Sequence, residues 1–123
     1  MAKVILIEDD LTMLSLLGTL LEMEGYMVAK LKDEENITDI LATMKLEKPD
    51  LALMDVHLPQ INGYDLVRHI RKDPELRDMR IIMTSGLDVH EECLKAGAND
   101  FILKPYMPDH LIRLIRENLA LIG

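Results

Sequence analysis

Residues that can do chemistry follow four of the short apolar runs in this sequence. They are Glu8, Asp9 and Asp10 after the first run, Asp55 after the third, Thr84 and Ser85 after the fourth, and Lys104 after the fifth. Two like charges about 4 Å apart repel by roughly 4 kcal/mol at an effective dielectric near 20, so clustered carboxylates need a cation or a proton to coexist. A hard divalent cation would meet that need.

The types of these side chains favour Mg²⁺ and phosphoryl transfer. Carboxylate oxygens with no thiolate or histidine pair beside them suit Mg²⁺, which keeps several waters that an incoming phosphate can displace. A carboxylate can act as a covalent nucleophile, and phosphoryl transfer needs cations to neutralise the equatorial oxygens. Asp55, the metal, Lys104 and Ser85 would supply these parts.

The elements that must position these residues follow from the hydrophobic pattern. Short apolar runs at 4–7, 26–31, 51–54, 81–83 and 101–103 alternate with longer segments of helical period. Such alternation predicts an α/β fold, with a parallel sheet covered by helices on both faces. In an open sheet of this kind, ligands bind beyond the carboxyl ends of the strands. The reactive residues should therefore meet at one edge.

Apolar stripes and turn residues mark the expected helices. The residues expected to face the sheet are Leu14, Leu17 and Leu21 in the first helix, Ile37, Ile40, Leu41 and Met44 in the second, and Leu111, Leu114, Ile115, Leu119 and Ile122 in the last. Gly25 and Gly97 stand where left-handed residues end helices, and Asn62 with Gly63 marks a turn.

Composition narrows the classes of function. A length of 123 residues fits one domain, and 22 acidic against 14 basic residues give a net charge of −8, which would repel a nucleic acid. The single cysteine, Cys93, allows no intrachain disulfide and no cysteine-zinc cluster. The first apolar run is too short for a signal-peptide core or a membrane span. We expect a cytoplasmic protein that does not bind nucleic acid directly or enter a membrane.

Four segments resemble the response-regulator receiver family of two-component signalling, particularly its single-domain, chemotaxis-regulator-like type. They read VILIEDD (4–10), LALMDVHLPQING (51–63), IIMTSG (81–86) and AGANDFILKPY (96–106), and the resemblance spans the chain. It implies a doubly wound, flavodoxin-like (βα)5 fold with a five-stranded parallel sheet in the order 2-1-3-4-5. Residues 1–123 would form one receiver domain, with no output domain.

The resemblance also implies a role for each reactive residue. Asp55 would be the phosphoacceptor. Asp9 and Asp55 would bind Mg²⁺ directly, Glu8 through water, and His57 through its backbone carbonyl. Lys104, with a cis peptide bond before Pro105, would be a second cation of the site.

Two further residues would form a switch. Ser85 matches the family's hydroxyl position better than Thr84, because Gly86 then falls on the small residue that follows it. Its hydroxyl would bond a phosphoryl oxygen, and the ring of Phe101 would move inward in response. The segment from Ser85 to Gly97 is about one helical turn shorter than in many relatives, so we expect a short or irregular fourth helix. Leu87, in this segment, occupies a position that is often polar in the family.

By this resemblance the chain is a signalling switch and not an enzyme acting on a separate substrate. A sensor histidine kinase or phosphotransfer protein would donate the phosphoryl group, and the domain would catalyse its own phosphorylation and slow autodephosphorylation. A downstream protein would bind the face of the fourth helix, fifth strand and fifth helix, with the chain monomeric or dimerising on phosphorylation.

Several alternatives remain beside this reading. The chain could be a phosphorylation-independent adaptor with the same fold, or a receiver module excised from a larger regulator. A phosphatase of the haloacid-dehalogenase type needs a second acid two residues after the nucleophile, where this chain has His57. A flavodoxin-like carrier needs a Ser/Thr/Gly-rich phosphate loop after the first strand, where Glu8, Asp9 and Asp10 would repel the phosphate. Asp10 could be only a helix cap, and Cys93 and the methionines only core residues.

Overall fold

The computed structural model describes residues 1–31 and 36–122, which form five strands and five helices in alternation. The strands are β1 (Lys3–Ile7), β2 (Met27–Leu31), β3 (Leu51–Asp55), β4 (Arg80–Ser85) and β5 (Asp100–Leu103). The helices are α1 (Leu11–Met23), α2 (Ile37–Glu47), α3 (Gly63–Lys72), α4 (His90–Ala96) and α5 (Pro108–Ala120).

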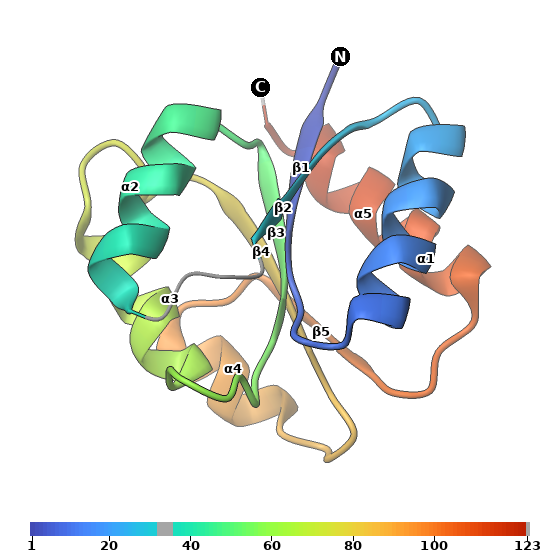
Figure 1. Ribbon diagram of the computed structural model, residues 1–123. Coiled ribbons are helices and arrows are strands. Elements are labelled where there is room, and N and C mark those ends of the chain that lie inside the picture. Colours follow the sequence, from blue (N-terminus) through green and yellow to red (C-terminus); the bar gives the residue numbers. More distant parts are fainter. Residues whose placement is uncertain (32–35, 123) are drawn as a thin grey trace.

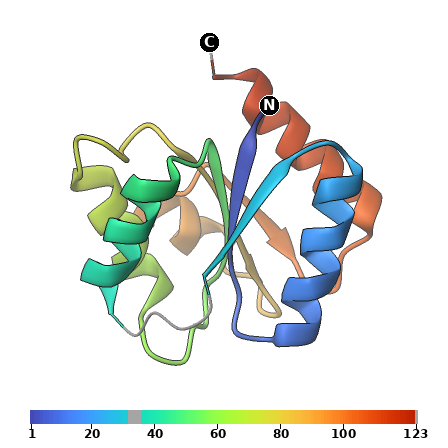
Figure 2. The ribbon, with the colours of Figure 1, turned by 45° about the horizontal axis from the view of Figure 1, so that its top comes forward.

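All strand pairs are parallel, and the sheet order is β2-β1-β3-β4-β5. Figures 1 and 2 show α2, α3 and α4 on one face of the sheet and α1 and α5 on the other. This confirms the expected doubly wound fold and its strand order. The direction of winding changes beside β1, so the ends of β1 and β3 border a crevice of the kind in which ligands bind.

Two apolar layers hold the helices to the sheet, because successive strand residues point to opposite faces. Ile5, Met54 and Met83 pack with α2, α3 and α4, whereas Leu6, Leu53 and Ile82 pack with α1 and α5. All three residues of the predicted α1 stripe are buried, as are Ile40 and Met44 of α2 and Leu111 and Ile115 of α5. The prediction that Ile122 faces the sheet was wrong. This residue lies beyond the end of α5 and is 43% exposed.

The element boundaries shift by one or two residues from the apolar runs, mostly because strands continue into polar residues. β4 begins at Arg80 and ends at Ser85, since backbone pairing with β3 and β5 continues past the apolar run. Gly25 and Gly97 adopt φ of 93° and 121° after α1 and α4, as predicted. The fourth helix has only seven residues, so of the two forms expected, short or irregular, the structure shows a short helix.

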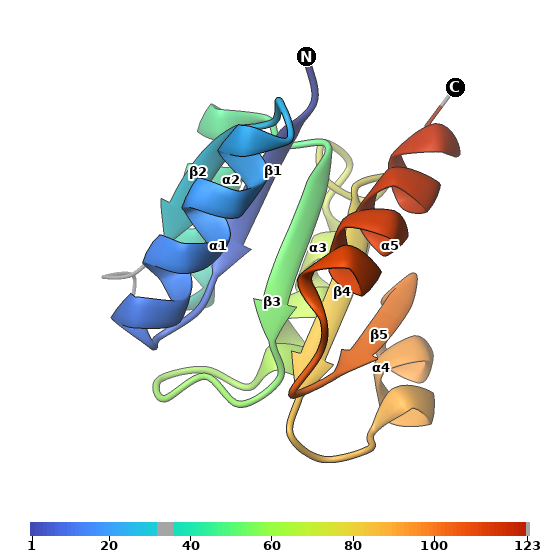
Figure 3. The same ribbon diagram turned by 90° about the vertical axis from the view of Figure 1, so that its right-hand side faces the viewer.

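The register of the sheet decides which reactive residues meet. Asp55 is paired with Thr84, and Ser85 with Leu103, so β3, β4 and β5 end at the same edge. Figure 3 shows the arrowheads of β3 and β4 at that edge, where the loops to α3 and α4 begin. Within residues 1–31 and 36–122, no helix has the length and apolar character needed to span a membrane.

Candidate functional site

Three acids gather at the carboxyl edge of the sheet. Carboxylate oxygens of Glu8, Asp9 and Asp55 lie within 4.8 Å of one another, an arrangement that could hold a metal ion. Glu8 and Asp55 are 5% and 8% exposed, whereas Asp9 faces solvent. Two buried carboxylates so close together require positive charge nearby, because burial disfavours their ionised forms.

Lys104 supplies part of that charge. Its Nζ donates to Asp55 Oδ2 at 2.7 Å and to Glu8 Oε1 at 3.1 Å. Alternation explains why the three side chains meet: each lies two residues beyond one that faces the layer of α1 and α5, namely Leu6, Leu53 and Ile102. The Lys104–Pro105 peptide bond is cis, as the resemblance implied.

The shifted pKa values show how burial and the ion pair compete. Burial raises the pKa of Glu8, and the hydrogen bond from Lys104 offsets only part of that rise. Burial acts to lower the pKa of Lys104, but the hydrogen bonds and charges of Asp55 and Glu8 outweigh it, so its pKa is raised. Lys104 is therefore fully protonated at neutral pH. Further positive charge nearby would stabilise the ionised form of Glu8.

The loop after β3 fixes the second oxygen of Asp55. The His57 backbone N–H donates to Asp55 Oδ1 at 2.8 Å, and His57 forms an isolated bridge with Asn62 across the loop. Gly63 begins α3 so close to the strand that an added Cβ would lie 2.7 Å from the Val56 carbonyl oxygen. The sequence marked Asn62 and Gly63 only as a turn; their contacts also hold the His57 backbone beside Asp55.

Asp10 is a helix cap and not a member of the acidic cluster. Its side chain caps α1 by accepting hydrogen bonds from Thr12 N at 3.0 Å and Met13 N at 3.1 Å. It is exposed, and it does not belong to the cluster of three acids. The helix that follows the acids is therefore anchored directly at the mouth of the site.

The two hydroxyls at the end of β4 point to opposite faces. Ser85 follows Met83 in the strand alternation, so it shares the α3 and α4 side with Phe101, which pairs with Met83. Its Oγ accepts a hydrogen bond from Leu87 N at 3.0 Å. Thr84 is turned toward α1 and α5, where its buried Oγ1 has no hydrogen-bond partner among the described residues. The face shared with Phe101 favours Ser85 for the switch role.

A groove beside Lys104 was not anticipated from the sequence. Met13, Leu16, Leu17 and Leu20 of α1 form one wall, and Lys104, Pro105, Tyr106 and Pro108 form the other. The Tyr106 hydroxyl is buried without a partner in the part of the chain that the structure describes, and burial raises its pKa. The sequence signal for this groove was the apolar composition of α1, whose only charged residue is Glu22.

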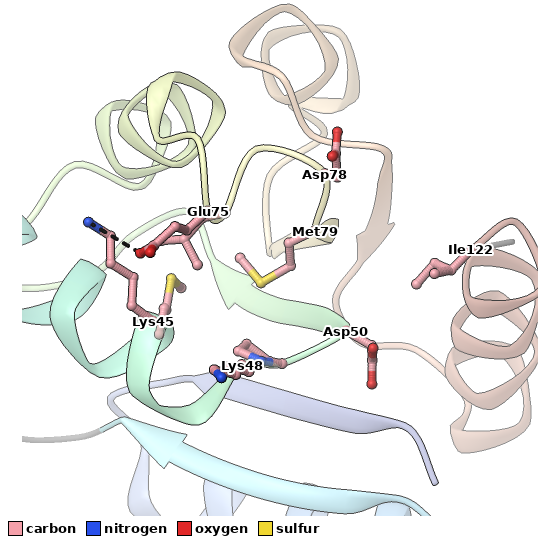
Figure 4. Close-up of a pocket in the computed structure, with 10 residues that line it drawn as sticks. Lys45, Lys48, Asp50, Glu75, Asp78, Met79 and Ile122 are labelled. Carbon is pink, nitrogen blue, oxygen red and sulfur yellow. Dashed lines mark ion pairs between the residues drawn. The ribbon is translucent and has the colours of Figure 1, made fainter.

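A second hollow lies at the opposite edge of the sheet, where Asp50 precedes β3 (Figure 4). Three of its charged residues have partners: Lys45 pairs with Asp73 at 2.7 Å and with Glu75 at 3.9 Å, and Asp50 accepts from Lys3 N at 2.8 Å. These pairs tie α2 to the segment after α3. We assign this hollow no chemistry.

Comparison with known proteins agrees with this geometry. Residues 4–116 match the family model of the response regulator receiver domain. The chain belongs to this family. Receiver domains are the signalling switches of two-component systems and interact with histidine kinases or phosphotransfer proteins. The three acids and Lys104 therefore lie in a domain of a signalling family.

Individual relatives show the range of the family. A probable transcriptional regulator, ycf27, of Cyanophora paradoxa is 34% identical over 120 residues, which are 95% of this chain and 48% of that protein. Protein PilH of Pseudomonas aeruginosa is 32% identical over 123 residues, 98% of this chain and 99% of PilH. The chain thus spans about half the length of the ycf27 relatives and nearly all of PilH.

A solved receiver domain shows the same architecture. The receiver domain of sensor histidine kinase PA1611 of Pseudomonas aeruginosa superposes with a TM-score of 0.83 at 27% identity, covering 97% of this chain and 98% of that chain. That structure has a magnesium ion coordinated in its active-site cleft.

We predict that Mg²⁺ stabilises this protein through Asp9. A ligand at ten times its Kd raises the free energy of unfolding by about 1.4 kcal/mol, and Asp9→Asn should reduce that gain to below about 0.5 kcal/mol by removing a charged ligand. Asp10→Asn is the matched control, because Asn caps a helix as well as Asp does. Urea unfolding with and without Mg²⁺ at constant ionic strength measures the gain. Equal stabilisation of all three proteins would place the metal elsewhere.

Proposed function

We propose that Asp55 accepts a phosphoryl group in a Mg²⁺-dependent reaction and that this switches the chain's interaction with another protein. The observation that carries the proposal is the position of Asp55. It is nine-tenths buried at the end of a strand, bonded to Lys104, and within 4.8 Å of two further acids. A purely structural aspartate would gain nothing from two other carboxylates at this distance.

The residues divide the work of the reaction. A carboxylate oxygen of Asp55 attacks phosphorus as the bond from phosphorus to the donor breaks, and the donor leaves with the electron pair of that bond. Mg²⁺, when bound, neutralises charge on the phosphoryl oxygens; Asp9, Asp55 and the His57 carbonyl would hold it directly, and Glu8 through water. Lys104 places a second positive charge beside the same oxygens, and the Ser85 hydroxyl donates to one of them.

The domain then acts on itself and not on a separate substrate. It catalyses its own phosphorylation and a slow hydrolysis of the resulting acyl phosphate. The turn of Ser85 toward the phosphoryl group and the movement of Phe101 alter the face of α4, β5 and α5, where a downstream protein binds or a second copy of the chain associates. The same reaction serves a chain that works alone or within a longer regulator.

A phosphorylation-independent adaptor is the weaker candidate. An adaptor would need the fold but not the reactive residues, and here Glu8, Asp9, Asp55 and Lys104 lie together at one edge. Lys104 bonds both buried carboxylates, an arrangement that costs desolvation and is therefore expected where it serves chemistry.

We predict that incubation with acetyl phosphate and Mg²⁺ adds one phosphoryl group to the chain. Asp55→Asn should abolish the adduct, because the amide is a poor nucleophile of the same shape. Asp78→Asn, exposed at the opposite edge of the sheet, should leave it unchanged. Intact-mass spectrometry with and without EDTA makes the measurement. An adduct that persists in Asp55→Asn, or without a divalent ion, would contradict the proposal.

We further propose that a protein phosphodonor covers the groove between α1 and Tyr106. Leu11 and Leu16 are 67% and 63% exposed on a helix with one charged residue, and a surface helix of this kind needs an apolar partner. The groove includes Lys104, so a protein seated in it lies at the mouth above Asp55. A small donor such as acetyl phosphate needs no such contact.

Leu16→Glu therefore separates the two kinds of donor. We expect transfer from a phosphorylated histidine phosphotransfer protein, chosen because it phosphorylates the unaltered chain, to slow about tenfold, as loss of a buried leucine contact implies. Phosphorylation by acetyl phosphate should change less than about twofold. Leu46→Glu on α2, where Leu46 is 84% exposed, is the matched control and should affect neither rate. Equal slowing with both donors would assign the effect to the fold.

A further inference from the structure

We propose that His90 is a positioning residue that holds the Phe101 ring and so sets how readily the domain switches. This inference rests on the proposed function, since it concerns the ring expected to respond to phosphorylation of Asp55. It assigns the regulation to a contact between two named side chains. It also gives the short α4 helix a role.

The contact is an aromatic stack. The rings of His90 and Phe101 have centroids 5.8 Å apart and planes inclined by 21°, a stacked arrangement. Phe101 is half-buried against the core cluster that contains Met83 and Cys93, while His90 is exposed. The imidazole therefore covers the outer side of a ring whose inner side faces the core. Any rearrangement of Phe101 away from this position must break the stack.

The loop that carries His90 begins at the switch hydroxyl. Only four residues separate Ser85 from His90, and the N–H of one of them, Leu87, donates to Ser85 Oγ at 3.0 Å. If Ser85 Oγ turns toward a phosphoryl oxygen, that hydrogen bond must change, and the loop loses this contact with the strand. His90 and Phe101 are thus connected to Ser85 twice, through this loop and through the pairing of β4 with β5.

The first turn of α4 is suited to movement. Val89 at its N-cap provides no side-chain hydrogen bond to the helix. The helix has seven residues, of which Cys93 at its centre and Ala96 at its C-terminal end are buried in the core, and Val89 packs partly buried against the same cluster. A short helix without a cap frays more easily than a longer capped one, so His90 can leave Phe101 while Cys93 stays in the core.

The stack consequently favours the unphosphorylated arrangement. An aromatic pair of this kind corresponds to a factor of about two to ten in an equilibrium constant. Ligands that favour the switched state bind less tightly by the same factor, if the unswitched state predominates. Removal of the imidazole should then make the site easier to load, although His90 touches neither metal nor phosphate.

The test is the affinity of the chain for beryllofluoride, a phosphoryl mimic, at saturating Mg²⁺, measured by fluorine NMR. His90→Asn, which removes the aromatic ring from an exposed position, should tighten binding about two- to tenfold. His90→Phe, which keeps a stacking ring, should stay within about twofold of the unaltered chain. In a Phe101→Leu background, His90→Asn should have no effect. A residue that only supports folding would not show this pattern.

The outcomes separate this inference from the function on which it rests. Beryllofluoride binding that is unchanged or weaker in His90→Asn, with normal binding by the unaltered chain, would overturn the role of His90 and leave the phosphoacceptor in place. The same would follow if the effect of His90→Asn persisted without the Phe101 ring. An unaltered chain that neither binds beryllofluoride nor gains a phosphoryl group would overturn the proposed function itself, and the role of His90 with it.

Discussion

The bridge from Lys104 to Asp55 and Glu8 is the interaction on which the rest of the site depends. Two carboxylates that are almost fully buried would repel each other and resist ionisation without it. Lys104 makes both hydrogen bonds from the end of β5, on the far side of β4, so the cluster forms only when β1, β3 and β5 all end at the same edge. The Lys104 ammonium group can therefore reach both carboxylates only in a parallel sheet with this strand order.

The bridge does not remove the whole charge of the cluster. Three carboxylates face one lysine, and the raised pKa of Glu8 shows that burial still outweighs the compensation it receives. A divalent cation would complete the balance, and an incoming phosphoryl group would bring new negative charge for Lys104 and the metal to share. An arrangement that is electrostatically incomplete by itself is suited to a switch, because binding and phosphorylation both change its balance.

Much of this could be predicted from the sequence because parallel strands are read almost directly from apolar runs. The residues after those runs are forced to one edge, which is why Glu8, Asp55 and Lys104 were expected to meet and do. The strand order followed from resemblance to receiver domains, which pattern alone does not provide. The brevity of α4 was visible in the spacing from Ser85 to Gly97.

Other features depend on contacts that no local pattern encodes. The stripe of α5 predicted that Ile122 faces the core, but periodicity does not say where a helix ends, and α5 stops at Ala120. Ser85 and Thr84 are adjacent and chemically alike, and only the pairing of β4 with β5 shows which shares a face with Phe101. The stack of His90 on Phe101 depends on a four-residue loop, and the groove at Tyr106 depends on how α1 lies beside the segment that joins β5 to α5.

The most direct test of the central claim, that Asp55 is phosphorylated beside a metal held by its neighbours, is a crystal structure with Mn²⁺ in place of Mg²⁺ and beryllofluoride in place of phosphate. The account predicts one anomalous peak coordinated by Asp9, Asp55 and the His57 carbonyl, with beryllium on Asp55 and fluorides bonded to Lys104 and Ser85. A metal peak away from these acids, or beryllofluoride bound elsewhere or not at all, would contradict it.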